Sequence, residues 1–121
     1  MVSSGPLSSG AIGIALIGMA KDEYGRIMRA SCGLAALLSR APEDLIGTRL
    51  CQHLDPRDHS ESHGAFLRLM ARPEDLYEGD LRFVTADGRV VAVRAVASIV
   101  AARHGPAILL RVLSGSGASS P

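Results

Sequence analysis

The sequence has few aromatic residues, few cysteines and no excess of either charge, and each shortage excludes a class of protein. It has no Trp, two Tyr and two Phe, so surfaces on which a flavin ring could stack are scarce. Its two cysteines, Cys32 and Cys51, are too few for a disulfide scaffold. Both lie in apolar stretches where a free thiol packs as a small hydrophobe, which favours a reducing, cytoplasmic compartment. Lys plus Arg number 13 against 12 Asp plus Glu, so no broad positive field would attract nucleic acid or an anionic membrane.

A long apolar run and a secretory leader are also lacking. The longest apolar run, residues 11–20, is far below the roughly 20 residues that cross a bilayer. Residues 1–10 contain no Lys or Arg for a signal-peptide n-region. We therefore expect no association with a membrane. At 121 residues the chain fits one domain with one core. Ser and Gly dominate residues 1–10 and 114–121, which predicts flexible tails on either side of a domain at 11–113.

Residues 77–113 have the pattern of three β-strands joined by two reverse turns. The first turn is Asp87-Gly88, a dipeptide that supplies the positive φ angles of a tight hairpin, and the second is His104-Gly105-Pro106. Upstream, residues 11–19 are apolar and rich in isoleucine, which predicts a strand in the middle of the sheet, buried on both faces. Residues 26–30 alternate polar and apolar and complete a first hairpin after a turn at 22–25.

Short helices are predicted between the two groups of strands. Ser31 is an N-cap for a helix through Leu34, Leu37 and Leu38, whose leucines would face the sheet. A second helix begins at Pro42, and Gly47 stands where a left-handed residue ends it. A longer helix covers about 57–71, opened by Asp55-Pro56 and ended by Pro73. We expect its apolar stripe to comprise Phe66, Leu67 and Met70, extended backwards by His59 and His63.

This order of elements favours an α+β fold: a five-stranded antiparallel sheet, covered on one face by short helices and one longer helix. Ser, His and Asp all occur in the chain, but no G-x-S-x-G elbow, Gly-rich phosphate loop or H-E-x-x-H helix is found. The sequence therefore predicts a binding module and not an enzyme.

The arrangement, with its residues, resembles the PAS sensory domain over about residues 11–113. The segments that carry the resemblance are Ile14-Ala15-Leu16, Gly25-Arg26-Ile27, Pro42-Glu43-Asp44-Leu45-Ile46-Gly47, Asp55-Pro56-Arg57-Asp58, Leu81-Arg82-Phe83 and Asp87-Gly88-Arg89. The resemblance implies a regulatory ligand- or protein-interaction module of a larger bacterial-type signalling protein, attached to a histidine kinase, cyclase, phosphatase or transcription regulator. A ligand or partner would shift the population between two packings of the helices on the sheet.

The resemblance also raises the question of a cofactor. The stretch from His63 to Leu67 looks like the haem-binding helix of oxygen-sensing PAS proteins, and Arg82 lies on the strand where those proteins keep a distal arginine. A haem-binding gas or redox sensor that uses His63 is therefore the alternative to a partly buried, hydrogen-bonded histidine. Leu50 stands where photosensory members carry their reactive cysteine, and Cys51 is one position off, which argues against flavin. His59 and His63 are one turn apart, but no further ligands complete a metal site.

The fourth strand is apolar on both of its faces. One alternating set faces the expected core, and the other is interrupted only by Arg94 and Ser98. A sheet covered by helices on one side should be polar on the other, so the second set implies a partner. We expect a homodimer, or docking of an attached effector domain, through Val90, Ala92, Val96 and Val100.

Overall fold

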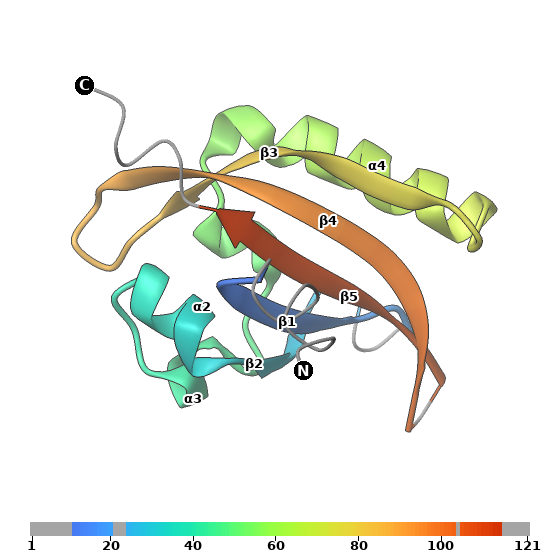
Figure 1. Ribbon diagram of the computed structural model, residues 1–121, viewed down its shortest axis with the longest axis horizontal. Coiled ribbons are helices and arrows are strands. Elements are labelled where there is room, and N and C mark those ends of the chain that lie inside the picture. Colours follow the sequence, from blue (N-terminus) through green and yellow to red (C-terminus); the bar gives the residue numbers. More distant parts are fainter. Residues whose placement is uncertain (1–10, 21–23, 104, 115–121) are drawn as a thin grey trace, which may run out of the picture.

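The computed structural model describes residues 11–20, 24–103 and 105–114. Five antiparallel strands form one sheet in the order β2-β1-β5-β4-β3 (Figure 1). The strands are β1 (Gly13–Gly18), β2 (Ile27–Ala30), β3 (Leu76–Val84), β4 (Val90–Ala102) and β5 (Gly105–Ser114). The predicted α+β sheet is therefore confirmed. The two predicted tails lie outside the described residues, except that β5 extends to Ser114.

The helical segments lie between β2 and β3 along the chain and cover one face of the sheet (Figure 1). They are α2 (Cys32–Leu37), α3 (Pro42–Leu45), the short 3-10 helices η2 (Leu50–His53) and η3 (Pro56–Asp58), and α4 (His59–Ala71). The core lies between these helices and the inner face of the sheet, and Phe83, Leu34 and Leu45 are fully buried in it. None of the described helices is long and apolar enough to cross a membrane.

Strand β1 differs from its prediction. It lies between the edge strand β2 and β5, so β5 and not β1 occupies the middle of the sheet. Only one of its faces is fully buried: Ala15 and Ile17 face the core, whereas Ile14 is 40% exposed. The reason is that the helices cover only the inner face, and an isoleucine-rich run has the same sequence pattern whether its outer side chains are covered or not.

Local chemistry fixes the ends of the short helices as predicted. The Ser31 hydroxyl accepts hydrogen bonds from the Leu34 N–H at 3.2 Å and from the Ile14 N–H at 2.9 Å, so one side chain caps α2 and ties it to β1. Gly47 has a φ of +90°, the left-handed geometry expected just after α3. Helix α2 packs so closely on β1 that a Cβ atom at Gly13 would lie 2.9 Å from the Leu34 Cα.

The beginning of α4 is anchored to the outer edge of β3 by two aspartates. Asp58 accepts hydrogen bonds from the backbone N–H of Arg82 at 2.7 Å and from its Nη2 at 2.7 Å. The Asp55 N–H donates to the Arg82 carbonyl at 2.8 Å. Because β3 is an edge strand, the polar backbone groups of Arg82 would otherwise face solvent. The two aspartates therefore cover this part of the edge of β3 and fix the position of the beginning of α4.

The anchoring also explains why the predicted apolar stripe of α4 is partly wrong. Ala65 and Leu69 are buried, whereas Leu67 and Met70 are 48% and 41% exposed. Phe66 is half-buried against the core. Asp58, the last residue of η3, is bonded to Arg82 on β3, and the helix that starts from this fixed point buries the small side chain of Ala65. A tertiary contact of this kind leaves no periodic signal in the helix itself.

We expect Asp58→Asn to lower the free energy of unfolding by about 1–2 kcal/mol. Hydrogen bonds to charged groups contribute about 1.5–3 kcal/mol each, but the Arg82 side chain is 36% exposed, so water screens the pair. The hydrogen bond from Arg82 lowers the pKa of Asp58. Its stabilising contribution is thus present above the unfolded pKa of about 3.9 and is lost as the pH falls through the folded value.

Urea denaturation near neutral pH and at about pH 3 measures both effects. The matched control is Asp80→Asn, whose partner Arg94 lies at the surface and whose own side chain is 76% exposed; we expect a change of about 0–1 kcal/mol there. Equal losses in the two variants would contradict the anchoring role of Asp58, as would a difference between wild type and Asp58→Asn that persists unchanged in acid.

Candidate functional site

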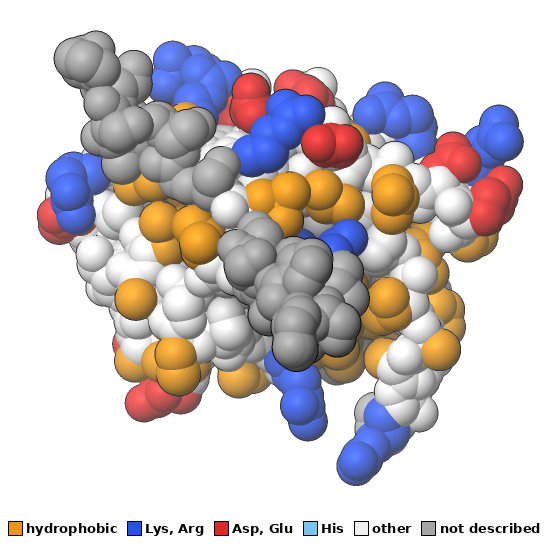
Figure 2. Space-filling model, in the orientation of Figure 1, with side chains coloured by type: hydrophobic (Ala, Val, Ile, Leu, Met, Phe, Trp, Pro, Cys, Tyr) orange, Lys and Arg blue, Asp and Glu red, His pale blue; other side chains and the backbone are white. Residues whose placement is uncertain are grey.

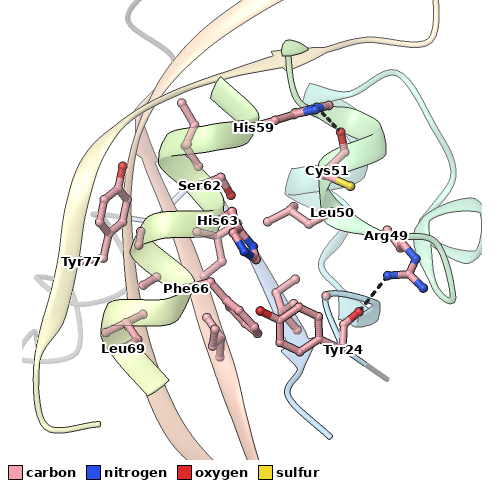
Figure 3. A pocket seen from close by; sticks show the side chains of 17 residues that line it. Tyr24, Arg49, Leu50, Cys51, His59, Ser62, His63, Phe66, Leu69 and Tyr77 are labelled. Atoms are coloured by element: carbon pink, nitrogen blue, oxygen red, sulfur yellow. Dashed lines mark hydrogen bonds between the residues drawn. The ribbon is translucent and has the colours of Figure 1, made fainter. Parts of the chain in front are cut away.

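A cavity of about 260 Å³ lies beneath α4, between that helix, η2 and the inner face of the sheet (Figure 3). Its interior is apolar, because each strand alternates and presents its inner residues to the helices. The helices contribute Leu50, Ala65 and Leu69, and the sheet contributes Leu81, Ala97 and Leu110. The small side chains of Ala65 and Ala97 leave space that larger residues would fill. The cavity thus results from incomplete coverage of the sheet.

Two aromatic side chains from different elements meet at this cavity. The rings of Tyr24, in the turn before β2, and Phe66, on α4, have centroids 4.4 Å apart at an interplanar angle of 85°. This edge-to-face geometry is favourable for aromatic pairs. Tyr77 lines the cavity from β3, and its hydroxyl donates to Glu61 at 3.3 Å. Burial, followed by the nearby charge of Glu61, raises the pKa of Tyr77, so its hydroxyl stays protonated at neutral pH.

The two histidines of α4 lie at the cavity, and both are exposed. His59 is already engaged, because its Nε2 lies 2.9 Å from the Cys51 carbonyl and 3.2 Å from that of Leu54. Figure 3 shows the His63 ring projecting from α4 toward Leu50, while the Cys51 thiol points away from α4. Within the described ranges, no group of three or more His, Cys, Asp or Glu side chains is placed to hold a metal ion.

The structure does not bring Arg82 to His63. Arg82 is not among the residues that line the cavity, and its guanidinium is held by the Asp58 carboxylate at 2.7 Å. Its side chain lies at the free edge of β3, where the chain enters α4. A group bound at His63 would therefore not have Arg82 beside it unless the ion pair with Asp58 were broken.

His53, the last residue of η2, is a buried polar residue that the sequence analysis did not single out. The Thr48 hydroxyl donates its one hydrogen to the Leu45 carbonyl, so its oxygen accepts from the His53 Nε2–H at 2.9 Å. The His53 Nδ1 then carries a lone pair and is buried without a partner among the described residues. Burial, followed by the positive charge of Arg40, lowers the pKa of His53. The imidazole is therefore held in its neutral form.

The four residues predicted as a partner surface lie on the outer face of the sheet, opposite the helices. Val90 is 47% exposed and Val96 only 8%; Ala92 and Val100 are half-buried. In the view of Figures 1 and 2, α4 lies behind the strands and part of this face is turned to the reader. Figure 2 shows hydrophobic side chains gathered there, below an edge where basic and acidic side chains alternate.

Sequence reasoning found part of the cavity wall and missed the rest. It identified His63 and Phe66 from the expected helix face. It did not identify Tyr24, Arg49 or Ser62, which also line the cavity. Tyr24 lies in a turn, Arg49 immediately precedes η2, and a single polar residue in such places carries no periodic pattern. Their convergence depends on the tertiary arrangement.

Comparison with known proteins agrees with this architecture. A family model described as PAS fold matches residues 27–112. No curated protein matches the chain. Three solved structures have the same fold. The PAS domain of a two-component sensor histidine kinase is 14% identical, with a TM-score of 0.66 and 90% of each chain covered. The PAS domain of a protein from Colwellia psychrerythraea is 12% identical, with a TM-score of 0.70, and the match covers 96% of this chain and 99% of that chain; a variant PAS-B domain of Drosophila melanogaster Cycle with bound glycerol is 12% identical, with a TM-score of 0.70, and the match covers 83% of this chain and 96% of that chain.

The burial of neutral His53 predicts a stability that depends on pH. The pKa of His53 is lowered in the folded state, so near pH 6.5 its imidazole binds a proton in the unfolded chain more readily than in the folded chain. We expect the free energy of unfolding to fall as the pH is lowered from about 8 to about 5.5, and this fall to be smaller in His53→Gln. The matched control is His63→Gln, which makes the same substitution at an exposed histidine.

A second measurement does not require the variant to fold. Titration of the wild-type imidazole signals by NMR should give His53 a midpoint below the ordinary value of about 6.5. A His53 midpoint at or above the ordinary value of about 6.5, or an unchanged pH dependence in His53→Gln, would contradict the inference.

Proposed function

The chain belongs to the PAS family, and we propose that it is the sensory module of a larger signal-transduction protein. In this proposal a small molecule enters the cavity beneath α4, and an attached effector or a second copy of the chain responds to the resulting change. The module performs no catalysis of its own. The similar fold of a PAS domain from a sensor histidine kinase supports an effector of that class.

The observation that carries the proposal is the shared wall of the cavity. Leu69 and Phe66 belong to α4, Leu50 to η2, and Ala97 and Leu110 to the sheet. A molecule that fills the cavity contacts α4, η2 and the sheet at once, so it favours the arrangement of α4 and η2 that accommodates it. Occupancy then shifts the population of helix positions by the difference in affinity between them.

The size and surroundings of the cavity favour a small ligand over the alternative of haem on His63. Ligand sites of drug-sized molecules occupy about 300–1,000 Å³, and this cavity is about 260 Å³. Arg82, the expected distal group, is held by Asp58 outside the cavity. His63 is present at the cavity, but haem would need a larger space, and Arg82 could serve as its distal group only if the ion pair with Asp58 were broken. The residues therefore do not fit haem.

The outer face of the sheet supports a second copy of the chain as the partner. Val90 and Ile14 are 47% and 40% exposed on this face. Arg94, also on it, pairs with Glu78 at 3.1 Å and with Asp80 at 3.3 Å, so its charge is balanced within the face. Arg111 lies between Ile14 and Val96 in the register of the same face. A two-fold interface needs only one self-complementary surface. Through such an interface, a change in the sheet of one protomer reaches the other.

Ala97→Leu tests the cavity. Ala97 is 6% exposed on the inner face of β4, and a leucine there would occupy part of the cavity. We expect wild type to bind the neutral probe n-octanol with chemical-shift changes at Leu69 and Phe66, and Ala97→Leu to bind it about tenfold more weakly, a loss of about 1.4 kcal/mol. The matched control is Ala101→Leu, the same substitution at an exposed position of the same strand.

Equal binding by wild type and Ala97→Leu, or shift changes confined to residues outside the cavity, would contradict the proposal. So would a Soret band that forms on haem reconstitution and disappears in His63→Ala, because that result would favour the haem alternative.

Val90→Glu tests the partner surface. A carboxylate in an apolar interface must be desolvated without a partner, and the two-fold symmetry places two such charges on the same contact area. We expect the wild-type chain to be a dimer by light scattering at tens of micromolar and Val90→Glu to be a monomer. The control Ala86→Glu adds the same charge at an exposed position of the β3–β4 turn. A monomeric wild type, or a dimer that survives Val90→Glu, would contradict this assignment.

A further inference from the structure

The cavity has an apolar interior and a mouth lined by basic side chains. Among the described residues that line it there is no Asp or Glu, whereas Arg49, His59 and His63 all reach it. Arg49 and His63 come from opposite sides: Arg49 immediately precedes η2, and His63 lies on α4 (Figure 3). A molecule with its body in the interior would place its head between these two elements.

The Arg49 side chain retains capacity to bind a ligand. Its Nη1 donates one long hydrogen bond, 3.4 Å, to the Tyr24 carbonyl, and no carboxylate among the described residues forms an ion pair with it. A guanidinium has five donors in a planar fork that matches a carboxylate in bidentate geometry. His59, by contrast, is committed to the carbonyls of Cys51 and Leu54. Arg49 is therefore the group at the mouth that is best placed to select a charged head.

Volume limits the size of the body. At about 30 Å³ per non-hydrogen atom, the share of one molecule in liquid water, a cavity of about 260 Å³ holds roughly nine such atoms. Branched or polycyclic molecules of greater size would not fit between Leu69 and Leu110. A medium-length aliphatic chain would fit with its polar end at the opening.

We propose that the cavity takes a medium-chain monocarboxylate, with the aliphatic chain against Leu69, Leu81 and Leu110 and the carboxylate at the Arg49 guanidinium. This inference rests on the proposed sensory function and names the chemical class of its ligand. His63 lies across the mouth on α4, so a bound carboxylate draws α4 and η2 toward each other. The head group, and not only the filling of the cavity, then contributes to the signal.

The test compares three probes that share one chain length: octanoate, n-octanol and octylamine. Dissociation constants are measured by NMR titration near neutral pH for wild type, Arg49→Gln and the control Arg103→Gln, which removes the same charge at an exposed position away from the cavity. We expect octanoate to bind wild type about tenfold more tightly than n-octanol, the gain typical of a hydrogen bond to a charged group. In Arg49→Gln the preference for octanoate over n-octanol should disappear, and Arg103→Gln should behave as wild type.

The outcomes separate this inference from the function on which it rests. Equal binding of octanoate and n-octanol at the cavity would overturn the head-group assignment and leave the cavity proposal standing. A preference for octanoate that survives in Arg49→Gln, or tighter binding of octylamine, would also overturn it. If none of the three probes perturbs the cavity residues of wild type, both the inference and the proposed ligand-binding function fail.

Discussion

The sheet presents an apolar inner face that a set of short helices must cover, and the other features of the molecule depend on how incompletely they do so. Helices α2 and α3 seal the end near β1 and β2, where Leu34 and Leu45 are fully buried. Helix α4 spans the rest and presents the small side chain of Ala65 to the sheet. Asp58 fixes the beginning of α4 at the edge of β3, and the cavity lies beneath the rest of the helix.

Much of the fold was predictable because local chemistry specifies it. Ser31, Gly47 and the Asp87-Gly88 turn each satisfy a backbone requirement within a few residues, and such requirements are visible in sequence. The antiparallel order followed from the absence of long crossover helices. The position of β1 and the exposure of its outer residues were not predictable, because an apolar run has the same sequence pattern whether or not another element covers both of its faces.

The site was less predictable than the fold, and the reason is the same for each residue involved. Arg82 alternates along β3 as a strand residue should, yet its side chain is drawn to Asp58, 24 positions earlier in the chain. His53 is buried and neutral because of Thr48 and Arg40, and Tyr24 reaches Phe66 across the cavity. Each depends on a tertiary contact between segments whose own patterns are unremarkable in isolation.

Helix α4 is held firmly at its beginning and only lightly along its length. It contains Gly64 and several residues of modest helix propensity, and its wall toward the sheet borders a cavity and not a packed core. Its hydrogen bonds therefore break at lower free energy than those of the central strands. Amide protons of α4 should thus exchange with solvent through local opening, whereas those of β4 and β5 should exchange only through global unfolding. The protein then has two separate levels of stability within one small domain.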